Sequence, residues 1–324
     1  MNTSTLPQNI QIIEQALNWS RHEEIWLCTV LQTWGSSPRS PGALMVANAR
    51  GEWCGSLSGG CVEESFLSQL KNGDWREASQ VVRYGADGLQ PDISLPCGGK
   101  LDILIEYLPA GSNTSAYLEQ LHRAFMGYQP VCKTLVLPAA CQHISPCEPT
   151  GHPAVIYDAP QVTIWHDAAP CLFIAGYSSV AEYCISFGYA LGFEVIVCEP
   201  REEIFSKLAH TLPKHVRLIT RLPATYLETE GCHARTAIVA LTHDARMDDL
   251  TLMEAVNTPA FYIGAMGSKN NSQKRFERLT RVAGLSETEL ARIHAPIGLD
   301  LGSKTPAEIA LSVLADIVSY KNGL

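Results

Sequence analysis

The sequence predicts an α/β protein in which a mixed α/β domain is followed by a doubly wound parallel sheet. With 324 residues the chain is long enough for two domains, and its 46% hydrophobic and 18% charged residues are typical of a globular protein. Helix and strand patterns are mixed in the first third of the chain, whereas strands and helices alternate regularly after residue 170. Regular alternation is the pattern of a parallel sheet with helices on both faces.

The N-terminal domain, which we place at residues 1–137, contains both kinds of pattern. Ile10, Ile13 and Leu17 recur at helical spacing, and a β-rich run follows at 25–34. Turn residues separate the elements after it. We expect further strands at 43–49, 53–58, 81–87 and 101–108, and helices at 61–73 and 114–127.

Residues 138–169 are the expected linker between the domains. They are rich in Pro, His and Cys, lack helical periodicity and contain two short strand patterns, 153–157 and 162–165. The run 141–152 contains four potential metal ligands. Because their spacing matches none of the usual paired-ligand patterns, we expect no metal site there.

The C-terminal domain, residues 170–324, repeats the order strand then helix. We expect strands at 170–176, 194–200, 216–220, 236–242 and 261–267, and helices that begin near 179, near 201 and after 250. Near the end of the chain, Thr305 and Glu308 form a capping-box pattern with Pro306 at the first helical position. This pattern predicts a well-specified final helix.

Charge and cysteine content limit the class of protein. The 24 basic and 33 acidic residues give a net charge of -9, and no basic run is long enough to bind along the phosphate backbone of a nucleic acid. We therefore expect no nucleic-acid partner. The first residues do not resemble an export signal and no apolar run is long enough for a membrane, so we expect a cytoplasmic location without membrane association. The eleven cysteines are then mostly reduced thiols.

The segment 172–199 has the layout of a Rossmann dinucleotide-binding unit. A strand leads through Gly176 into a helix, and the acidic Glu199 follows the next strand. We expect this helix to bury Val180, Cys184, Phe187 and Leu191 on one face. The usual second glycine of the phosphate turn is replaced by Ser178. Because Ser178 and Ser179 can donate hydrogen bonds at a helix N-terminus, we expect a phosphate or nucleotide ligand. A purely structural Rossmann domain is the alternative.

Two later strand ends also have polar residues. Gly264, Gly267, Ser268 and Lys269 lead into a helix with Lys274 and Arg275, which predicts an anion site, with a solvated basic helix as the alternative. The other strand end has His243, Asp244 and Asp248, for which we favour a capped turn over a metal site.

Two cysteines adjoin pairs of glycines. The first motif is Gly59, Gly60 and Cys61, and the second is Cys97, Gly98 and Gly99. A thiol at a helix N-terminus is a better nucleophile or metal ligand, although Glu63 and Glu64 oppose this effect. Glycines let a planar ligand approach the backbone. The residues alone leave open whether these are ligand sites or tight turns beside core cysteines.

The motifs together resemble the xanthine dehydrogenase accessory factor family of the XdhC/CoxI type. The resemblance extends from about residue 25 to 320. It rests on GSSPRSPGALM, GSLSGGCVEES, PCGGKLDI, FIAGYSSVA, LGFEVIVCEPREE, THD, YIGAMGSKNN and PIGLDLGSKTPAEIAL, in that order. Family members commonly have a glycine-histidine pair where this chain has Ser178-Ser179, so this chain departs from the family pattern at that turn.

The resemblance implies a maturation chaperone and not a metabolic enzyme. Such a chaperone binds the molybdenum cofactor (molybdopterin, or its cytosine dinucleotide form) while a cysteine desulfurase supplies its terminal sulfido ligand. It then inserts the cofactor into an apo molybdoenzyme of the xanthine dehydrogenase or aldehyde oxidoreductase class. The family also implies a homodimer. By resemblance, the two cysteine motifs would bind the cofactor, with Cys61 near the molybdenum, where a soft thiolate suits the metal.

Two other functions stay open. The Rossmann layout also fits an NAD(P)-dependent oxidoreductase, although Ser178 and the absence of an evident hydride-transfer acid pair oppose it. The third possibility is an assembly scaffold without a ligand. Its signature would be unchanged partner activation after replacement of both Cys61 and Cys97 by alanine.

Overall fold

The computed structural model describes residues 7–35, 39–85, 88–89, 99–141, 143–148, 154–214, 216–242 and 244–324. The chain divides into an N-terminal unit, Gln8–Ala168, and a C-terminal unit, Ala169–Leu324. Three residues named above, Cys97, Gly98 and His243, lie outside the described residues, as does part of the run 141–152.

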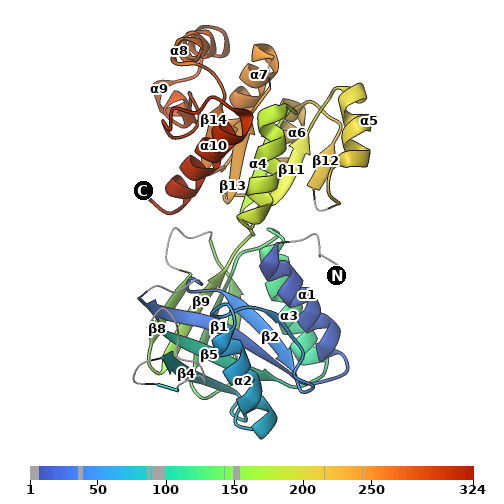
Figure 1. The fold of residues 1–324 in the computed structure, drawn as a ribbon, viewed down its shortest axis with the longest axis vertical. Helices are drawn as coiled ribbons and strands as arrows, with labels where there is room; N and C mark the ends of the chain where they lie inside the picture. Colours follow the sequence, from blue (N-terminus) through green and yellow to red (C-terminus); the bar gives the residue numbers. More distant parts are fainter. Residues whose placement is uncertain are drawn as a thin grey trace. The chain divides into compact units, whose positions relative to one another are not determined.

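The N-terminal unit contains a five-stranded antiparallel sheet in the order β3-β2-β1-β5-β4 (Figure 1). Its long central strands, β1 (Ile25–Trp34) and β5 (Lys100–Leu108), are rich in the β-branched and aromatic residues that favour strands. The other strands are β2 (Leu44–Asn48), β3 (Trp53–Gly55) and β4 (Ser79–Gly85).

A second antiparallel sheet of the same unit has the order β7-β6-β9-β8. Its strands are β6 (Val131–Val136), β7 (His143–Pro146), β8 (Val155–Asp158) and β9 (Gln161–His166). Most of this sheet comes from the segment expected to link the domains. Apolar residues of this segment, such as Val162 and Ile164, pack with Leu31 and Leu104 of the first sheet, so the segment contributes to a core.

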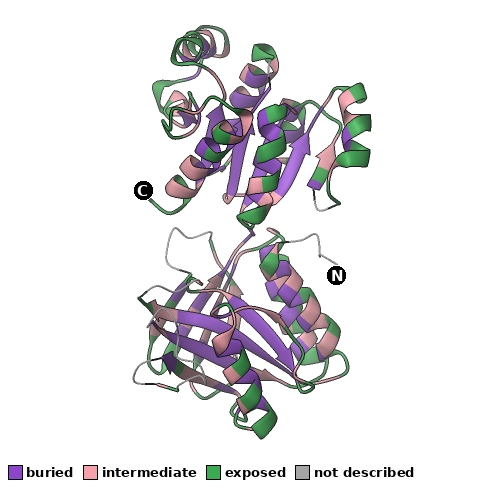
Figure 2. Cartoon of the chain, viewed as in Figure 1, coloured by how far each residue is buried: buried purple, intermediate pink, exposed green. Residues whose placement is uncertain are grey.

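Three helices complete the N-terminal unit: α1 (Gln8–Ser20), α2 (Cys61–Asn72) and α3 (Ser112–Phe125). Val62, Phe66 and Leu70 place one face of α2 against the five-stranded sheet, and α2 ends at Gly73, which adopts a left-handed conformation. Figure 2 shows the resulting pattern, with buried strands and helices exposed on one side only. Helix α1 packs on α3 and on β2.

The C-terminal unit is built on a parallel six-stranded sheet in the order β12-β11-β10-β13-β14-β15. Numbered within the unit this order is 3-2-1-4-5-6, that of the Rossmann fold. The prediction of a doubly wound parallel sheet is thus confirmed. The strands are β10 (Cys171–Ala175), β11 (Glu194–Cys198), β12 (Val216–Ile219), β13 (Thr236–Ala240), β14 (Tyr262–Ala265) and β15 (Ile293–His294).

Helices cover both faces of the parallel sheet. Helices α4 (Ser179–Ala190) and α10 (Pro306–Lys321) pack on one face. Helices α6 (Pro223–Glu230) and α7 (Ala245–Ala255) pack on the other. The remaining helical segments are α5 (Glu202–Thr211), α8 (Lys269–Arg278), a π-helical turn (Leu279–Ala283) and α9 (Glu287–Leu290).

The predicted start of the last helix is confirmed. Thr305 is its N-cap, Pro306 is its first residue, and the Thr305 hydroxyl accepts the Glu308 N–H at 3.3 Å.

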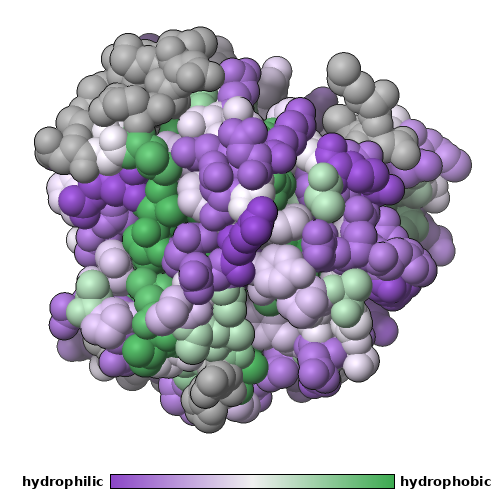
Figure 3. Space-filling view, turned by 90° about the horizontal axis from the view of Figure 1, so that it is seen from below, coloured by the Kyte–Doolittle hydropathy of each residue, from purple (hydrophilic) through white to green (hydrophobic). Residues whose placement is uncertain are grey.

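Most residues on the face shown in Figure 3 are polar, and apolar residues form a narrow band across it. No helix within the described residues combines the length and apolar character needed to cross a bilayer. None of the ten described cysteines forms a disulfide with another described cysteine. Burial raises the pKa of the Cys184 thiol to about 12, which makes it an inert core residue.

Candidate anion-binding site

The loop before Cys61 is folded around the carboxylate of Glu63. This carboxylate accepts hydrogen bonds from the backbone N–H groups of residues 57–60 and from the hydroxyls of Ser56 and Ser58, at 2.7 to 3.1 Å. Burial alone would raise the pKa of Glu63, but the hydrogen bonds from Ser58 and Ser56 lower it to about 2. Glu63 is therefore a charged anchor for the loop.

The predicted ligand groups Gly59 and Gly60 are part of this loop. Their φ angles are +94° and +150°, which only glycine adopts readily. Their N–H groups are bonded to Glu63, so the loop conformation is explained by the protein itself. Cys61 is half-buried and begins helix α2, as predicted. A ligand role for these three residues stays a prediction.

Of the second cysteine motif, the structure describes Gly99 alone. Gly99 is buried, and its Cα lies 3.3 Å from the point where a Cβ on Gly35 would stand. The close approach places Gly99 beside the end of β1. Since Cys97 and Gly98 are outside the described residues, the cofactor-binding role expected for this motif stays a prediction.

The glycine turn of the Rossmann unit is packed against the protein's own side chains. A Cβ on Gly176 would lie 2.2 Å from Thr242 Cγ2 and 2.9 Å from Met247 Cε, so no side chain fits there. Ser178 is the N-cap of α4, and its buried Oγ accepts the Ala181 N–H at 3.3 Å. Ser179 is exposed at the first helical position. The turn therefore needs a glycine because of packing, without any ligand.

The acid that would hold a ribose in a dinucleotide site is also engaged. Glu199 is fully buried after β11, and it accepts hydrogen bonds from the Tyr177 N–H and from the backbone and guanidinium of Arg201, at 2.7 to 2.8 Å. Burial raises the pKa of Glu199, but these bonds lower it below its usual value. Both carboxylate oxygens thus have protein partners.

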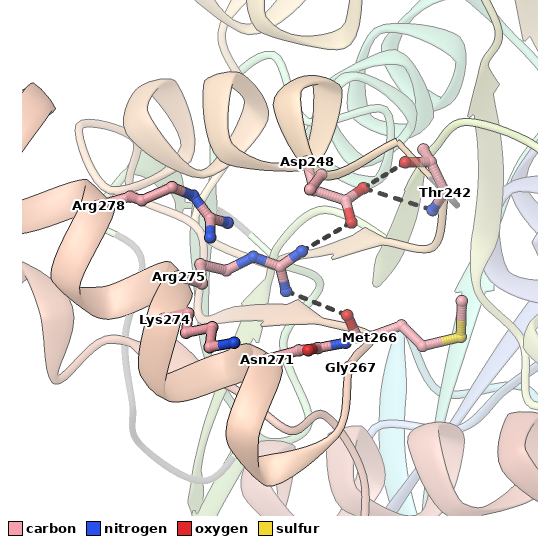
Figure 4. Close-up of a pocket in the computed structure, with 9 residues that line it drawn as sticks. Thr242, Asp248, Met266, Gly267, Asn271, Lys274, Arg275 and Arg278 are labelled. Carbon is pink, nitrogen blue, oxygen red and sulfur yellow. Dashed lines mark hydrogen bonds and ion pairs between the residues drawn. The ribbon is translucent and has the colours of Figure 1, made fainter.

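A pocket of about 350 Å³ opens at the carboxyl ends of the neighbouring strands, β13 and β14 (Figure 4). This edge of a doubly wound sheet is where such folds bind ligands. Its lining comes from two separate segments that the sheet brings together. The lining residues are Thr242, Ala245, Asp248, Met266, Gly267, Asn271, Lys274, Arg275 and Arg278.

Arg275 is the fixed centre of this pocket. Its guanidinium donates to Asp248 at 2.9 Å, to Asp249 at 3.0 Å and to the Met266 carbonyl at 3.0 Å, and the residue is 5% exposed. The buried Asp248 also accepts the Thr242 hydroxyl at 2.7 Å. Burial raises the pKa of Asp248 above its usual value, although Thr242 and Arg275 oppose the shift. These bonds fix Arg275 in place.

Two further cations of α8 line the same pocket. Arg278 binds Asp249 at 2.8 Å through Nε, whereas Lys274 is exposed and makes no ion pair or hydrogen bond within the described part of the chain. The three cations Lys274, Arg275 and Arg278 face the two carboxylates Asp248 and Asp249, so one positive charge is in excess. The arrangement suits an anion.

The sequence predicted part of this site. Gly267 lines the pocket and Ser268 is the N-cap of α8, as its position suggested, whereas Lys269 is exposed and is not among the lining residues. The expected capped turn at Asp244 is confirmed, because its carboxylate accepts the Arg246 N–H at 2.9 Å. No cluster of potential metal ligands occurs among the residues the structure describes.

Sequence reasoning missed Thr242, Asn271 and Arg278 as pocket residues. The helical spacing of 271, 274, 275 and 278 was an available signal, because residues three and four apart share one helix face. No comparable signal in the sequence points to Thr242, which the sheet brings to the pocket from a different segment.

The fold and this site define a Rossmann-type protein with a cation-lined pocket at the carboxyl ends of β13 and β14, and a separate α/β unit precedes it in the chain. Two family models match the chain in the order of its units. The model described as XdhC and CoxI family matches residues 18–85, and the model described as XdhC Rossmann domain matches residues 172–317. Both units of the chain therefore match models of the XdhC and CoxI type.

Similar proteins match along nearly the whole chain. The molybdenum cofactor insertion chaperone PaoD of Escherichia coli (strain K12) is 28% identical over 310 residues, which cover 91% of this chain and 83% of PaoD. A protein of Bacillus subtilis (strain 168), by name a probable xanthine dehydrogenase subunit, is 25% identical over 323 residues, 92% of this chain and 94% of that protein.

A solved structure is similar to the complete fold. The crystal structure of a xanthine dehydrogenase from Bacillus halodurans aligns with a TM-score of 0.73 at 21% identity, covering 97% of this chain and 96% of that one. This likeness supports the fold of both units.

Proposed function

We propose that this chain is a chaperone that binds the molybdenum cofactor, protects it during sulfuration and inserts it into an apo molybdoenzyme of the xanthine dehydrogenase or aldehyde oxidoreductase class. The observation behind the proposal is the match to PaoD, by name a molybdenum cofactor insertion chaperone, across 91% of this chain and therefore across both units. The Bacillus subtilis relative, whose name refers to xanthine dehydrogenase, supports the class of client enzyme.

The residues present fit such a cofactor chemically. Molybdopterin ends in a phosphate group, and the pocket beside β13 and β14 has an excess positive charge and a lysine without an ion pair among the described residues. Molybdenum is bound in the cofactor through sulfur. Within the N-terminal unit, Cys61 is a half-buried thiol at a helix start, and a soft sulfur of this kind suits the metal.

The test is to isolate the full-length protein from a host that makes the cofactor, oxidise it, and measure the fluorescence of released pterin. We expect fluorescent pterin from the wild-type protein and markedly less from Cys61→Ala. Cys54→Ala, which removes another half-buried thiol of the same unit, is the matched control and should retain the pterin. Repeated absence of pterin, with no activation of an apo molybdoenzyme, would rule the proposal out. Release of cytosine nucleotide would identify the dinucleotide form.

We extend the proposal to location and partners. That none of the ten described cysteines forms a disulfide with another suits the reducing cytoplasm. A cysteine desulfurase, not this chain, would supply the sulfur, and two copies of the chain would form a homodimer, as the family resemblance suggests. Copurification with the desulfurase tests the first partner, and the mass of the protein in solution tests the second.

One observation favours a second candidate. The strand order 3-2-1-4-5-6 is that of NAD-binding domains, which would suit an NAD(P)-dependent oxidoreductase. The engaged Glu199 and the Thr242 contact at Gly176 oppose it. Tight, saturable NADH binding by protein that retains no pterin would favour the oxidoreductase.

A further inference from the structure

The groups that bind the diphosphate and ribose of a dinucleotide in a Rossmann domain are engaged within this protein. Thr242 lies against Gly176, the Ser178 oxygen caps its own helix, and Glu199 is paired with Arg201. In contrast, the crevice one strand further along, between the ends of β13 and β14, is lined by Lys274 and Asn271, whose side chains have no hydrogen-bond partner among the described residues. An anionic ligand would therefore find its donors in that crevice and not at the glycine turn.

We propose that this pocket binds a phosphoryl group, with Lys274 as the cation that contacts it and Arg275 as the residue that holds the pocket in shape. The inference rests on the proposed function, because it assigns the phosphate end of the cofactor to the C-terminal unit. The ligand chemistry is a phosphate monoester or a diphosphate, as in the two forms of the cofactor.

Arg275 is fixed before any ligand arrives. Its three hydrogen-bonded contacts, to Asp248, Asp249 and Met266, use every nitrogen of the guanidinium. A group so constrained contributes positive charge without losing conformational freedom on binding. Asp248 also accepts the hydroxyl of Thr242, which follows β13, so it links Arg275 to the end of that strand. We therefore assign Arg275 and Asp248 as positioning residues.

Lys274 and Asn271 have no such constraint. Both side chains line the pocket from the same face of α8, as Figure 4 shows, and neither side chain has a hydrogen-bond partner within the described residues. A lysine ammonium and an amide are both donors, which a phosphoryl oxygen accepts. The exposed Lys274 can reach a ligand that is still partly in water.

A buried hydroxyl provides a second, independent indication. Ser272 is 2% exposed, and its Oγ has no hydrogen-bond partner among the described atoms. This oxygen lies 3.5 Å from the point where a Cβ on the pocket residue Gly267 would stand, and Arg275 Nη1 lies 3.7 Å from the same point. Because buried hydroxyls are normally paired, this hydroxyl is a donor without an acceptor directly beside the pocket residue Gly267.

The test is calorimetric titration of the full-length protein, free of pterin, with inorganic phosphate and with pyrophosphate at low and moderate salt. We expect saturable binding that salt weakens, and we expect Lys274→Gln to weaken it about tenfold, the effect of one lost charged hydrogen bond. Lys269→Gln removes the same charge from the same helix outside the pocket and should change the affinity little. Tighter binding of phosphate would indicate the phosphate monoester form of the cofactor, and tighter binding of pyrophosphate would indicate the diphosphate form.

A second variant protects the test against a folding artefact. Ser272→Ala removes an unpaired hydroxyl, so it should leave the urea midpoint unchanged or higher while it weakens phosphate binding. No binding by the wild-type protein, or equal losses in Lys274→Gln and Lys269→Gln, would overturn the assignment. Such a result would contradict the phosphoryl assignment but not the proposed function, which the pterin measurement tests separately. Phosphate binding by a protein that retains no pterin would contradict the proposed function but not the phosphoryl assignment.

Discussion

At the scale of single residues, Glu63 explains the shape of the loop before Cys61. Its carboxylate is 4% exposed and binds the loop's N–H groups, and its pKa is about 2. Glu63→Gln keeps one acceptor oxygen but loses the charge, so we expect the free energy of unfolding at pH 7 to fall by about 2 kcal/mol. Urea unfolding at pH 7 measures this.

The pH dependence of the unfolding free energy tests whether the charge of Glu63 is responsible for this stabilisation. The folded pKa lies below the ordinary value of 4.5, so the stabilisation is complete above pH 4.5 and is lost as the pH falls toward 2. Wild type should therefore lose its advantage over Glu63→Gln in that range. Glu64→Gln, an exposed neighbour in the same helical turn, is the control and should match wild type. An advantage that stayed constant from pH 7 to 3 would show that the charge is not responsible.

At the scale of elements, a buried ion pair joins the two sheets of the N-terminal unit. Lys133 of β6 is fully buried and donates to Glu106 of β5 at 2.6 Å and to the Tyr117 hydroxyl of α3 at 3.0 Å. Lys133→Met leaves the Glu106 charge buried without its partner. We expect a loss of about 3 to 5 kcal/mol in the free energy of unfolding, which denaturant titration measures.

The matched control for this prediction is the double variant Glu106→Gln, Lys133→Met. It removes both charges, and the glutamine oxygen can still accept the Tyr117 hydroxyl, which lies 3.2 Å from Glu106. We expect it to be more stable than Lys133→Met alone. If the double variant were the less stable of the two, the ion pair would not be the reason for the loss.

Elements whose information is local were predictable from the sequence. Helix α10 has its cap within three residues of its start, and α2 ends at the predicted Gly73. Leu191 was expected on the buried face of α4, but it is 48% exposed, because the helix ends at Ala190. Strands β8 and β9 were expected, but their pairing with β6 and β7 into one sheet was not, because strand pairing depends on contacts between distant residues that periodicity does not encode.

At the scale of the whole molecule, the candidate site combines residues that are far apart in the chain. Thr242 and Asp248 follow β13, whereas Lys274 and Arg275 belong to α8 after β14. The sequence indicated a basic helix start and an acidic strand end separately. Only the parallel pairing of β13 with β14 brings them together, so an ion pair between Asp248 and Arg275 could not be derived from either segment.

The division into two units leads to a last prediction. The apolar clusters that cover the two faces of the parallel sheet contain only residues between 171 and 317, so the C-terminal unit has a complete core of its own. A chain of residues 169–324 should therefore fold alone, with a cooperative urea transition and circular dichroism of an α/β protein. It should also bind pyrophosphate with the affinity of the full chain, because every pocket residue lies within it. A folded fragment without that affinity would mean that the N-terminal unit contributes to the anion site.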